Sequence, residues 1–115
     1  MTARVHRLSA RAPDDLVPLD SSLRGVTPDG ARRFFDVVRN WRLVRALLAD
    51  PGIHVRWLFI SNPLRAALLA EARHEGTPQL VRAAQVLHQP SDAPPHADHL
   101  HLRITCEPGE TRCRD

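Results

Sequence analysis

The sequence contains no lysine, no tyrosine and no long apolar run. Its 16 basic residues are all arginine and stand against 13 acidic residues, which gives a formal net charge of +3. The two kinds of charge are interspersed, so the net charge does not by itself indicate a nucleic-acid-binding protein. No apolar stretch approaches the roughly 20 residues that cross a membrane. Residues 1–7 are basic, but no apolar segment follows them, and we expect no secretory signal peptide here.

What the sequence does contain is enough apolar surface for one small domain. It has 115 residues, of which 43% are hydrophobic. That composition can build a core and argues against disorder. Proline, glycine, aspartate and serine are frequent in residues 1–30, where apolar residues show little periodicity. We therefore expect an irregular N-terminal segment over residues 1–30 and assign residues 31–115 to the regular part.

A helix is expected from Phe34 to Asp50. Asp36 is placed to accept hydrogen bonds from the free amides of the first turn. Pro51 ends the helix, because proline cannot continue it. The apolar residues that recur at helical spacing are Val37, Trp41, Val44 and Leu48. The arginines fall largely on the other side, which we interpret as a solvated face.

The segment 53–60 has the composition of a strand. Alternation assigns one face to Ile53, Val55, Trp57 and Phe59. The other face carries Leu58 and Ile60, so we expect it to be buried at its C-terminal end.

Two helices are expected after this strand. Ser61-Asn62-Pro63 and Thr77-Pro78 have the residues that begin helices, and Gly76 is placed to end the first of them. The apolar stripe expected for the second helix is Leu80, Val81, Ala84 and Leu87.

Four of the seven histidines lie in one stretch of 14 residues, and this clustering is the most informative feature of the chain. They are His88, His96, His99 and His101. Apolar and polar residues alternate strictly over 98–105, which predicts a strand with His99 and His101 on the same face. Their Cα atoms are then about 7 Å apart, so both imidazoles reach one small region.

The motif His96-x-x-His99-x-His101 has the residue type of a zinc site. Neutral imidazole is a good zinc ligand, and a catalytic zinc keeps three protein ligands and a water. A further imidazole near the metal acts as a general base or stabilises an oxyanion. The alternative is that these residues are surface or structural histidines.

Three other histidines have structural explanations. We interpret His88 as a structural or capping residue and His54 as a partly buried structural residue. His74 lies near a helix C-terminus, where a cation suits the helix dipole.

Cys106 and Cys113 stand at the two ends of an eight-residue segment in which Pro108 and Gly109 predict a turn. As zinc ligands they lack the usual Cys-x₂-Cys spacing. As a disulfide they would stabilise the fold by roughly 2.5 kcal/mol and place the protein in an oxidising compartment. Two free thiols are the third possibility, and the spacing leaves all three open.

These residues together resemble the C-terminal end of the penicillin-insensitive murein endopeptidases. Those are zinc peptidases related to lysostaphin-type enzymes and D-alanyl-D-alanine metallopeptidases. The similar features are the His-x-x-His-x-His spacing, Leu102-Arg103 after it, and the closely spaced cysteine pair. The similarity continues upstream through residues 35–61 and covers roughly residues 15–113.

The resemblance implies an α+β fold with a small antiparallel sheet flanked by helices, of which residues 31–115 are the C-terminal part. It implies hydrolysis of the D-alanyl–meso-diaminopimelyl cross-link of peptidoglycan in the periplasm. It makes His101 a Zn²⁺ ligand and His99 and His96 catalytic residues beside the metal. It also implies a disulfide between the two cysteines.

One family segment has no counterpart in the sequence. Ser-His-Gln-x-Gly-x-Asp-x-Asp supplies a histidine and an aspartate to the family's zinc, whereas His6 is followed by Asp14 and Asp15 without the intervening glycine. We therefore expect an N-terminally truncated or mis-started version of a longer enzyme, with peptidoglycan peptide as its substrate and no nucleic-acid partner. The alternatives are a non-catalytic remnant that binds cell-wall peptide or a partner, and an arginine-rich nucleic-acid binder.

Overall fold

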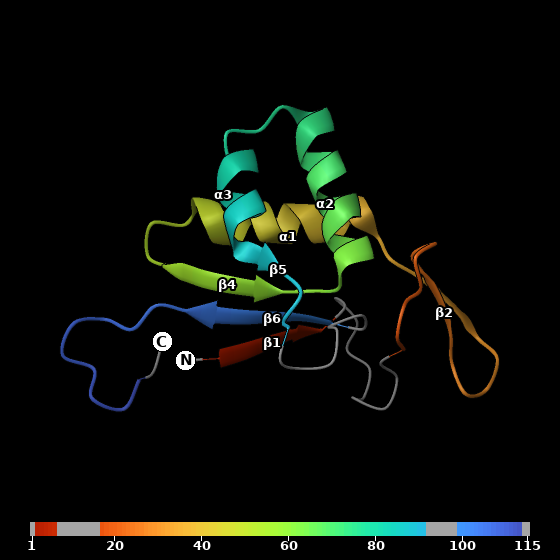
Figure 1. Cartoon of the computed structure of the whole chain (residues 1–115), viewed down its shortest axis with the longest axis horizontal. Coiled ribbons are helices and arrows are strands. Elements are labelled where there is room, and N and C mark those ends of the chain that lie inside the picture. Colours follow the sequence, from red (N-terminus) through yellow and green to blue (C-terminus); the bar gives the residue numbers. More distant parts are fainter. Residues whose placement is uncertain (1, 7–16, 92–98, 114–115) are drawn as a thin grey trace.

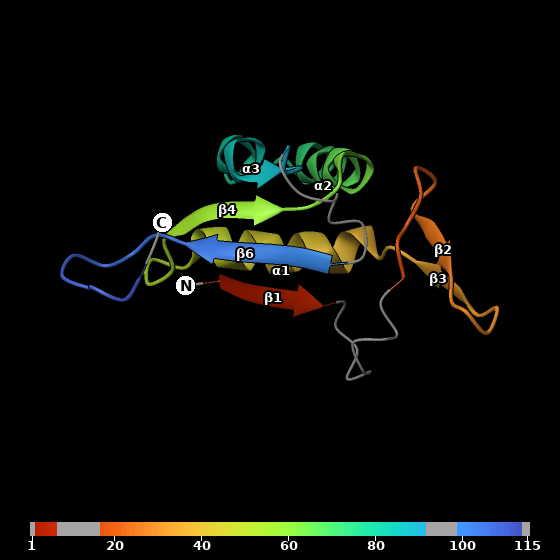
Figure 2. The same cartoon turned by 60° about the horizontal axis from the view of Figure 1, so that its bottom comes forward.

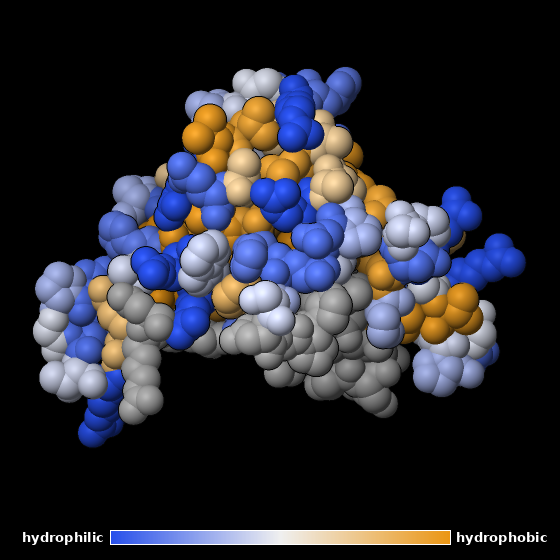
Figure 3. All heavy atoms as spheres, in the orientation of Figure 1, coloured by the Kyte–Doolittle hydropathy of each residue, from blue (hydrophilic) through white to orange (hydrophobic). Residues whose placement is uncertain are grey.

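The computed structural model describes residues 2–6, 17–91 and 99–113. Over these residues the protein is α+β, with three helices and two small sheets, one mixed and one antiparallel (Figure 1). The larger sheet has the order β1-β6-β4-β5 and consists of β1 (Thr2–His6), β4 (Val55–Phe59), β5 (Leu87–His88) and β6 (His99–Ile104). The smaller sheet is a hairpin of β2 (Arg24–Val26) and β3 (Arg32–Phe34). Hydrophobic residues are exposed on this hairpin, at the right in Figure 3.

The larger sheet is mixed because of its last strand. β6 pairs antiparallel with both β1 and β4, as the resemblance implied for the whole sheet. β5 instead runs parallel to β4, with Leu87 beside Leu58. A parallel neighbour requires a long crossover connection, and here two helices provide it between β4 and β5.

All three helices lie on one side of the larger sheet (Figure 2). The strands turn one set of side chains toward the helices, and these form the core together with the buried helix residues. The core residues contributed by the strands include Val55, Leu58, Leu87, Leu100 and Leu102. Among the described residues, no helix lies on the opposite face of the sheet. No helix in the described parts of the chain is long and apolar enough to cross a membrane.

Helix α1 (Val37–Ala49) confirms the expected helix and its cap. The carboxylate of Asp36 accepts a hydrogen bond from the backbone N–H of Arg39, at 3.0 Å. Trp41 and Val44 are fully buried. The helix begins later than expected because Phe34 belongs to β3.

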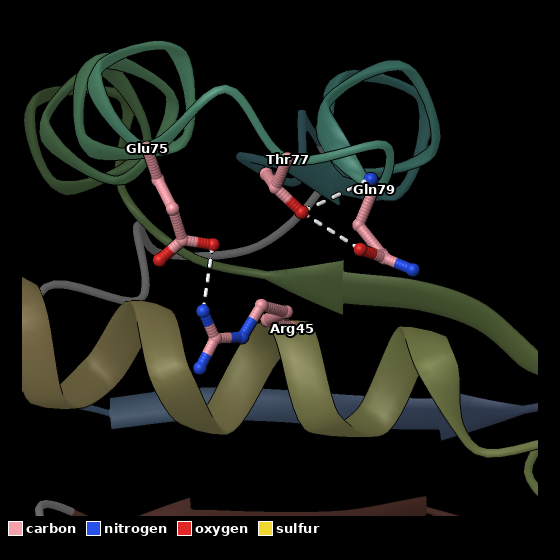
Figure 4. Close-up of polar contacts among 4 residues, drawn as sticks. All are labelled: Arg45, Glu75, Thr77 and Gln79. Carbon is pink, nitrogen blue, oxygen red and sulfur yellow. Dashed lines mark hydrogen bonds and ion pairs between the residues drawn. The ribbon is translucent and has the colours of Figure 1, made fainter.

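Helix α2 (Asn62–Glu75) also confirms its predicted ends. It begins after Ser61 and ends at Gly76, which adopts a left-handed conformation with φ of 71° that glycine accepts without strain. The backbone N–H of Gly76 donates to the carbonyl of Ala72. An ion pair of 2.7 Å between Arg45 and Glu75 joins α1 to the end of α2 (Figure 4).

Helix α3 (Leu80–Val86) corrects the expected apolar stripe. In the segment before this helix the Thr77 hydroxyl donates to Gln79 Oε1 at 2.7 Å, and the helix begins after Gln79 (Figure 4). Ala83 and Val86 are its buried residues, whereas Val81 is 68% exposed. Two of the four expected stripe residues, Val81 and Ala84, are exposed because the helix turns a different side toward the core. The other two are confirmed as core residues: Leu80 packs against the core, and Leu87 is buried as part of β5.

Strand β4 contains an irregularity that the alternation did not predict. Val55 pairs with Ile104 and Trp57 pairs with Arg103, so two steps along β4 oppose one step along β6. Such a bulge changes the face on which the preceding residue lies. Val55 is therefore buried with Leu58 and does not share a face with Trp57. The expected burial of Leu58 and Ile60 is confirmed.

The irregular structure expected for residues 1–30 is wrong in two places. β1 forms an edge of the larger sheet, and the β2–β3 hairpin crosses residue 30. A Cβ atom at Gly25 would lie only 2.6 Å from the carbonyl oxygen of Pro18, so glycine lets the segment around Pro18 approach the hairpin. Such short strands lack a long apolar alternation, and their pairing depends on distant partners.

Candidate functional site

Strand β6 presents His99 and His101 on the face of the sheet opposite its buried leucines. Leu100 and Leu102 point into the core, with exposures of 3% and 9%. Because side chains alternate along a strand, the two imidazoles emerge together on the other face. Both are half-buried, and their ring centroids lie 6.5 Å apart. The predicted strand and its two faces are confirmed.

Three further rings continue this surface across the neighbouring strands. The Phe59 ring lies 5.5 Å from that of His101 and 6.2 Å from that of Trp57, centroid to centroid. His88 on β5 is exposed and lies 5.4 Å from Trp57. We call these five residues the ring surface: His88, Trp57, Phe59, His101 and His99.

Sequence reasoning placed Trp57 and Phe59 on one strand face but did not connect them with the histidines. The connection depends on β4 lying antiparallel beside β6, with Phe59 opposite His101. His88 is not a helix cap, because α3 ends at Val86 and His88 lies in β5.

The distance between the rings of His99 and His101 decides whether both can bind one zinc ion as they stand. Two imidazoles bound to one tetrahedral zinc have ring centroids roughly 5 Å apart, given Zn–N bonds of about 2 Å. The 6.5 Å between His99 and His101 exceeds this, so the rings as they stand fit one ligand and one neighbour better than two ligands. Among the side chains that the structure describes, which lie in residues 17–91 and 99–113, no group of three or more histidine, cysteine, aspartate or glutamate residues is arranged to hold a metal.

Two residues considered for the site lie outside the described residues. They are Asp14, which was compared with a family ligand, and His96, which was expected to be catalytic and whose spacing also fits a zinc motif. The backbone register of β1 and β6 places His6 directly opposite His99.

The other histidines are on the surface. His54 was expected to be partly buried, but its side chain is 62% exposed because it precedes β4, and its Nε2 lies 3.9 Å from Glu107 Oε1. His74 is exposed in the last turn of α2, where a cation is favourable.

Cys106 and Cys113 form a disulfide, which decides between the three possibilities left open by their spacing. Their Cα atoms lie 5.6 Å apart, and the chain has no free cysteine. The bond closes the loop that follows β6. Since both sulfur atoms are used in it, this pair supplies no thiolate to a metal.

The fold and the ring surface define an α+β protein with a histidine- and aromatic-lined sheet face beside a disulfide-closed loop. Comparison with protein-family models, with curated proteins and with solved structures finds no match to this chain.

Proposed function

We propose that this protein is a zinc-dependent peptidase that hydrolyses the D-alanyl–meso-diaminopimelyl cross-links of peptidoglycan. The observation that carries the proposal is the placement of His99 and His101 side by side on the sheet face opposite the buried leucines of β6, directly before the disulfide loop. This arrangement agrees with the residue pattern of the murein endopeptidases that the sequence resembles.

The proposal gives each histidine a separate role. His101 binds the metal through a neutral imidazole nitrogen, and the ring of Phe59 packs against it and limits its rotation. The distance between the two rings is too long for both to bind the same ion as they stand, and the proposal therefore assigns His99 to proton transfer beside the metal. His96 is the second catalytic candidate. A bound zinc ion would polarise the peptide carbonyl and lower the pKa of its water to about 7.

The disulfide supports a periplasmic location. Disulfides persist in oxidising compartments and are rare in the reducing cytosol. The bacterial periplasm is such a compartment, and it is where peptidoglycan is accessible to hydrolases.

Zinc stoichiometry and cleavage of purified cross-linked muropeptides test the proposal together. The wild-type chain should retain about one zinc ion after dialysis, and His101→Gln should lose it. His99→Gln should keep the metal and lose cleavage by about 10²–10⁴-fold, as expected for a general acid or base. His74→Gln is the matched control, since this exposed histidine of α2 is remote from the ring surface.

A second candidate is non-catalytic binding of cell-wall peptide. It is favoured by the absence of a three-ligand group over the described residues. Wild-type protein that retains less than about a tenth of a zinc ion per chain and cleaves no muropeptide would overturn the peptidase proposal. Binding of uncleaved muropeptide to the same protein would then support the second candidate.

A further inference from the structure

A separate cavity of about 650 Å³ lies at the opposite end of β6 from His99. It opens where the turn after α1, the start of β4, helix α3 and the disulfide loop come together, at the left in Figure 1. Thr105 lines it and follows His101 by four residues, or about 13 Å along an extended strand. The cavity is therefore distinct from the ring surface, and its volume is in the range of small-molecule sites.

The cavity combines an apolar wall with charges of both signs. Its apolar side chains include Leu48, Ile53 and Val55. Four charged or titratable side chains surround them: Asp50, His54, Arg82 and Glu107.

The charged groups are anchored by bonds that leave them capacity for a ligand. Arg82 Nη2 donates to the carbonyl of Val55 at 2.5 Å, and a guanidinium has five N–H donors in all. Asp50 Oδ1 accepts from the backbone N–H of Gly52 at 2.8 Å, and each carboxylate oxygen has two lone pairs. Glu107 lies 3.9 Å from His54 with both side chains more than half exposed, a weak pair that a ligand can displace.

We propose that this cavity binds a small zwitterion that carries one carboxylate and one ammonium group, as an amino acid or the end of a short peptide does. A ligand of a single charge would meet a like charge on the wall, either Arg82 or the carboxylates of Asp50 and Glu107. A zwitterion can place its carboxylate beside the basic side chain and its ammonium group beside the acidic ones. The planar guanidinium of Arg82 matches a carboxylate, and the two acidic side chains match an ammonium.

The proposal does not depend on zinc or on the peptidase function. Titration of the full-length ¹⁵N-labelled protein with D-alanine, followed by amide chemical shifts, tests it. The expected changes are confined to residues 48–55, Arg82 and 105–108. Propionate and ethylamine, which each carry one of the two charges, should bind at least about tenfold more weakly. A parallel titration with D-alanyl-D-alanine distinguishes a free amino acid from the end of a peptide. If the dipeptide binds more tightly than D-alanine, the ligand is a peptide end; if it binds more weakly, the ligand is a free amino acid.

Two variants remove one charge each and have matched controls. Arg82→Gln and Glu107→Gln should each weaken D-alanine binding by about tenfold. Arg73→Gln and Glu71→Gln, on α2 and outside the cavity, should leave it unchanged. If Arg82→Gln does not fold, Glu107→Gln still decides the matter because Glu107 lies on the exposed loop. Propionate binding as tightly as D-alanine, shifts elsewhere in the protein, or unchanged binding by Glu107→Gln would each overturn the proposal.

Discussion

The ring of Phe59 meets the ring of His101 edge to face, with centroids 5.5 Å apart and planes inclined by 66°. The two residues stand opposite each other in the β4–β6 ladder, so strand pairing itself brings the rings together. Ring pairs in this geometry contribute about 0.5–1.5 kcal/mol beyond the area that they bury. Phe59 thus packs against the histidine to which our proposal assigns the metal.

A double-mutant cycle measures this contact. Phe59→Leu, His101→Gln and the double variant should give a coupling free energy of about 0.5–1.5 kcal/mol in urea unfolding, because leucine keeps apolar volume but loses the ring. A control cycle uses Phe34, which is 58% exposed on the hairpin. Its coupling with His101 should be zero within about 0.5 kcal/mol. Equal coupling in the two cycles would contradict a specific contact.

Reduction of the disulfide should destabilise the protein measurably. The bond between Cys106 and Cys113 closes an eight-residue loop, and the loop-entropy relation assigns about 2.5 kcal/mol to a loop of this length. Unfolding in urea with and without dithiothreitol measures the difference. The Cys106→Ala/Cys113→Ala variant should match the reduced wild type and be insensitive to dithiothreitol. A reductant effect that persists in this variant would assign the loss to another cause.

The features that sequence alone predicted are those set by local chemistry. Asp36 caps α1, Gly76 ends α2, and strict alternation places His99 and His101 on one face of β6, all through interactions within a few residues. The bulge beside Val55 was missed because it depends on register with β6.

Other features depended on tertiary partners in the same way. No pattern in the sequence of β1 marks it as an edge strand, because the strand forms by pairing with the distant strand β6. The ring surface combines residues from three strands, of which only the β6 histidines carried a recognisable motif. The spacing of Cys106 and Cys113 left three possibilities open. Only the folded loop, which brings the two sulfur atoms together, shows that they form a disulfide.

Helix α3 offers a direct test of the corrected stripe. Val81 is 68% exposed, so Val81→Ser should change the free energy of unfolding by no more than about 0.5 kcal/mol. Ala83 is fully buried, and Ala83→Leu should cost about 1–3 kcal/mol through overpacking. Both values come from urea unfolding monitored by circular dichroism. The stripe expected from sequence alone predicts the opposite result, in which the substitution at Val81 costs more stability than the one at Ala83.

The ion pair between Arg45 and Glu75 makes part of the stability depend on pH. The hydrogen bond from Arg45 lowers the pKa of Glu75 below its usual 4.5, since it favours the charged carboxylate. A carboxyl with a lower pKa in the folded state stabilises that state above the unfolded pKa, and the contribution is lost as pH falls through the folded pKa. Wild type should therefore be more stable than Glu75→Gln near pH 7, and the difference should shrink as the pH falls below 4.5 and through the lower pKa of the folded state.

Urea unfolding at several pH values measures this convergence. Glu71→Gln on the same helix is the control and should show no comparable change in its difference from wild type. Added salt should reduce the Glu75→Gln effect near neutral pH, because exposed ion pairs are screened. If Glu75→Gln differed from wild type by the same amount at every pH, its effect would come from packing or helix propensity, and the link between α1 and α2 would not be electrostatic.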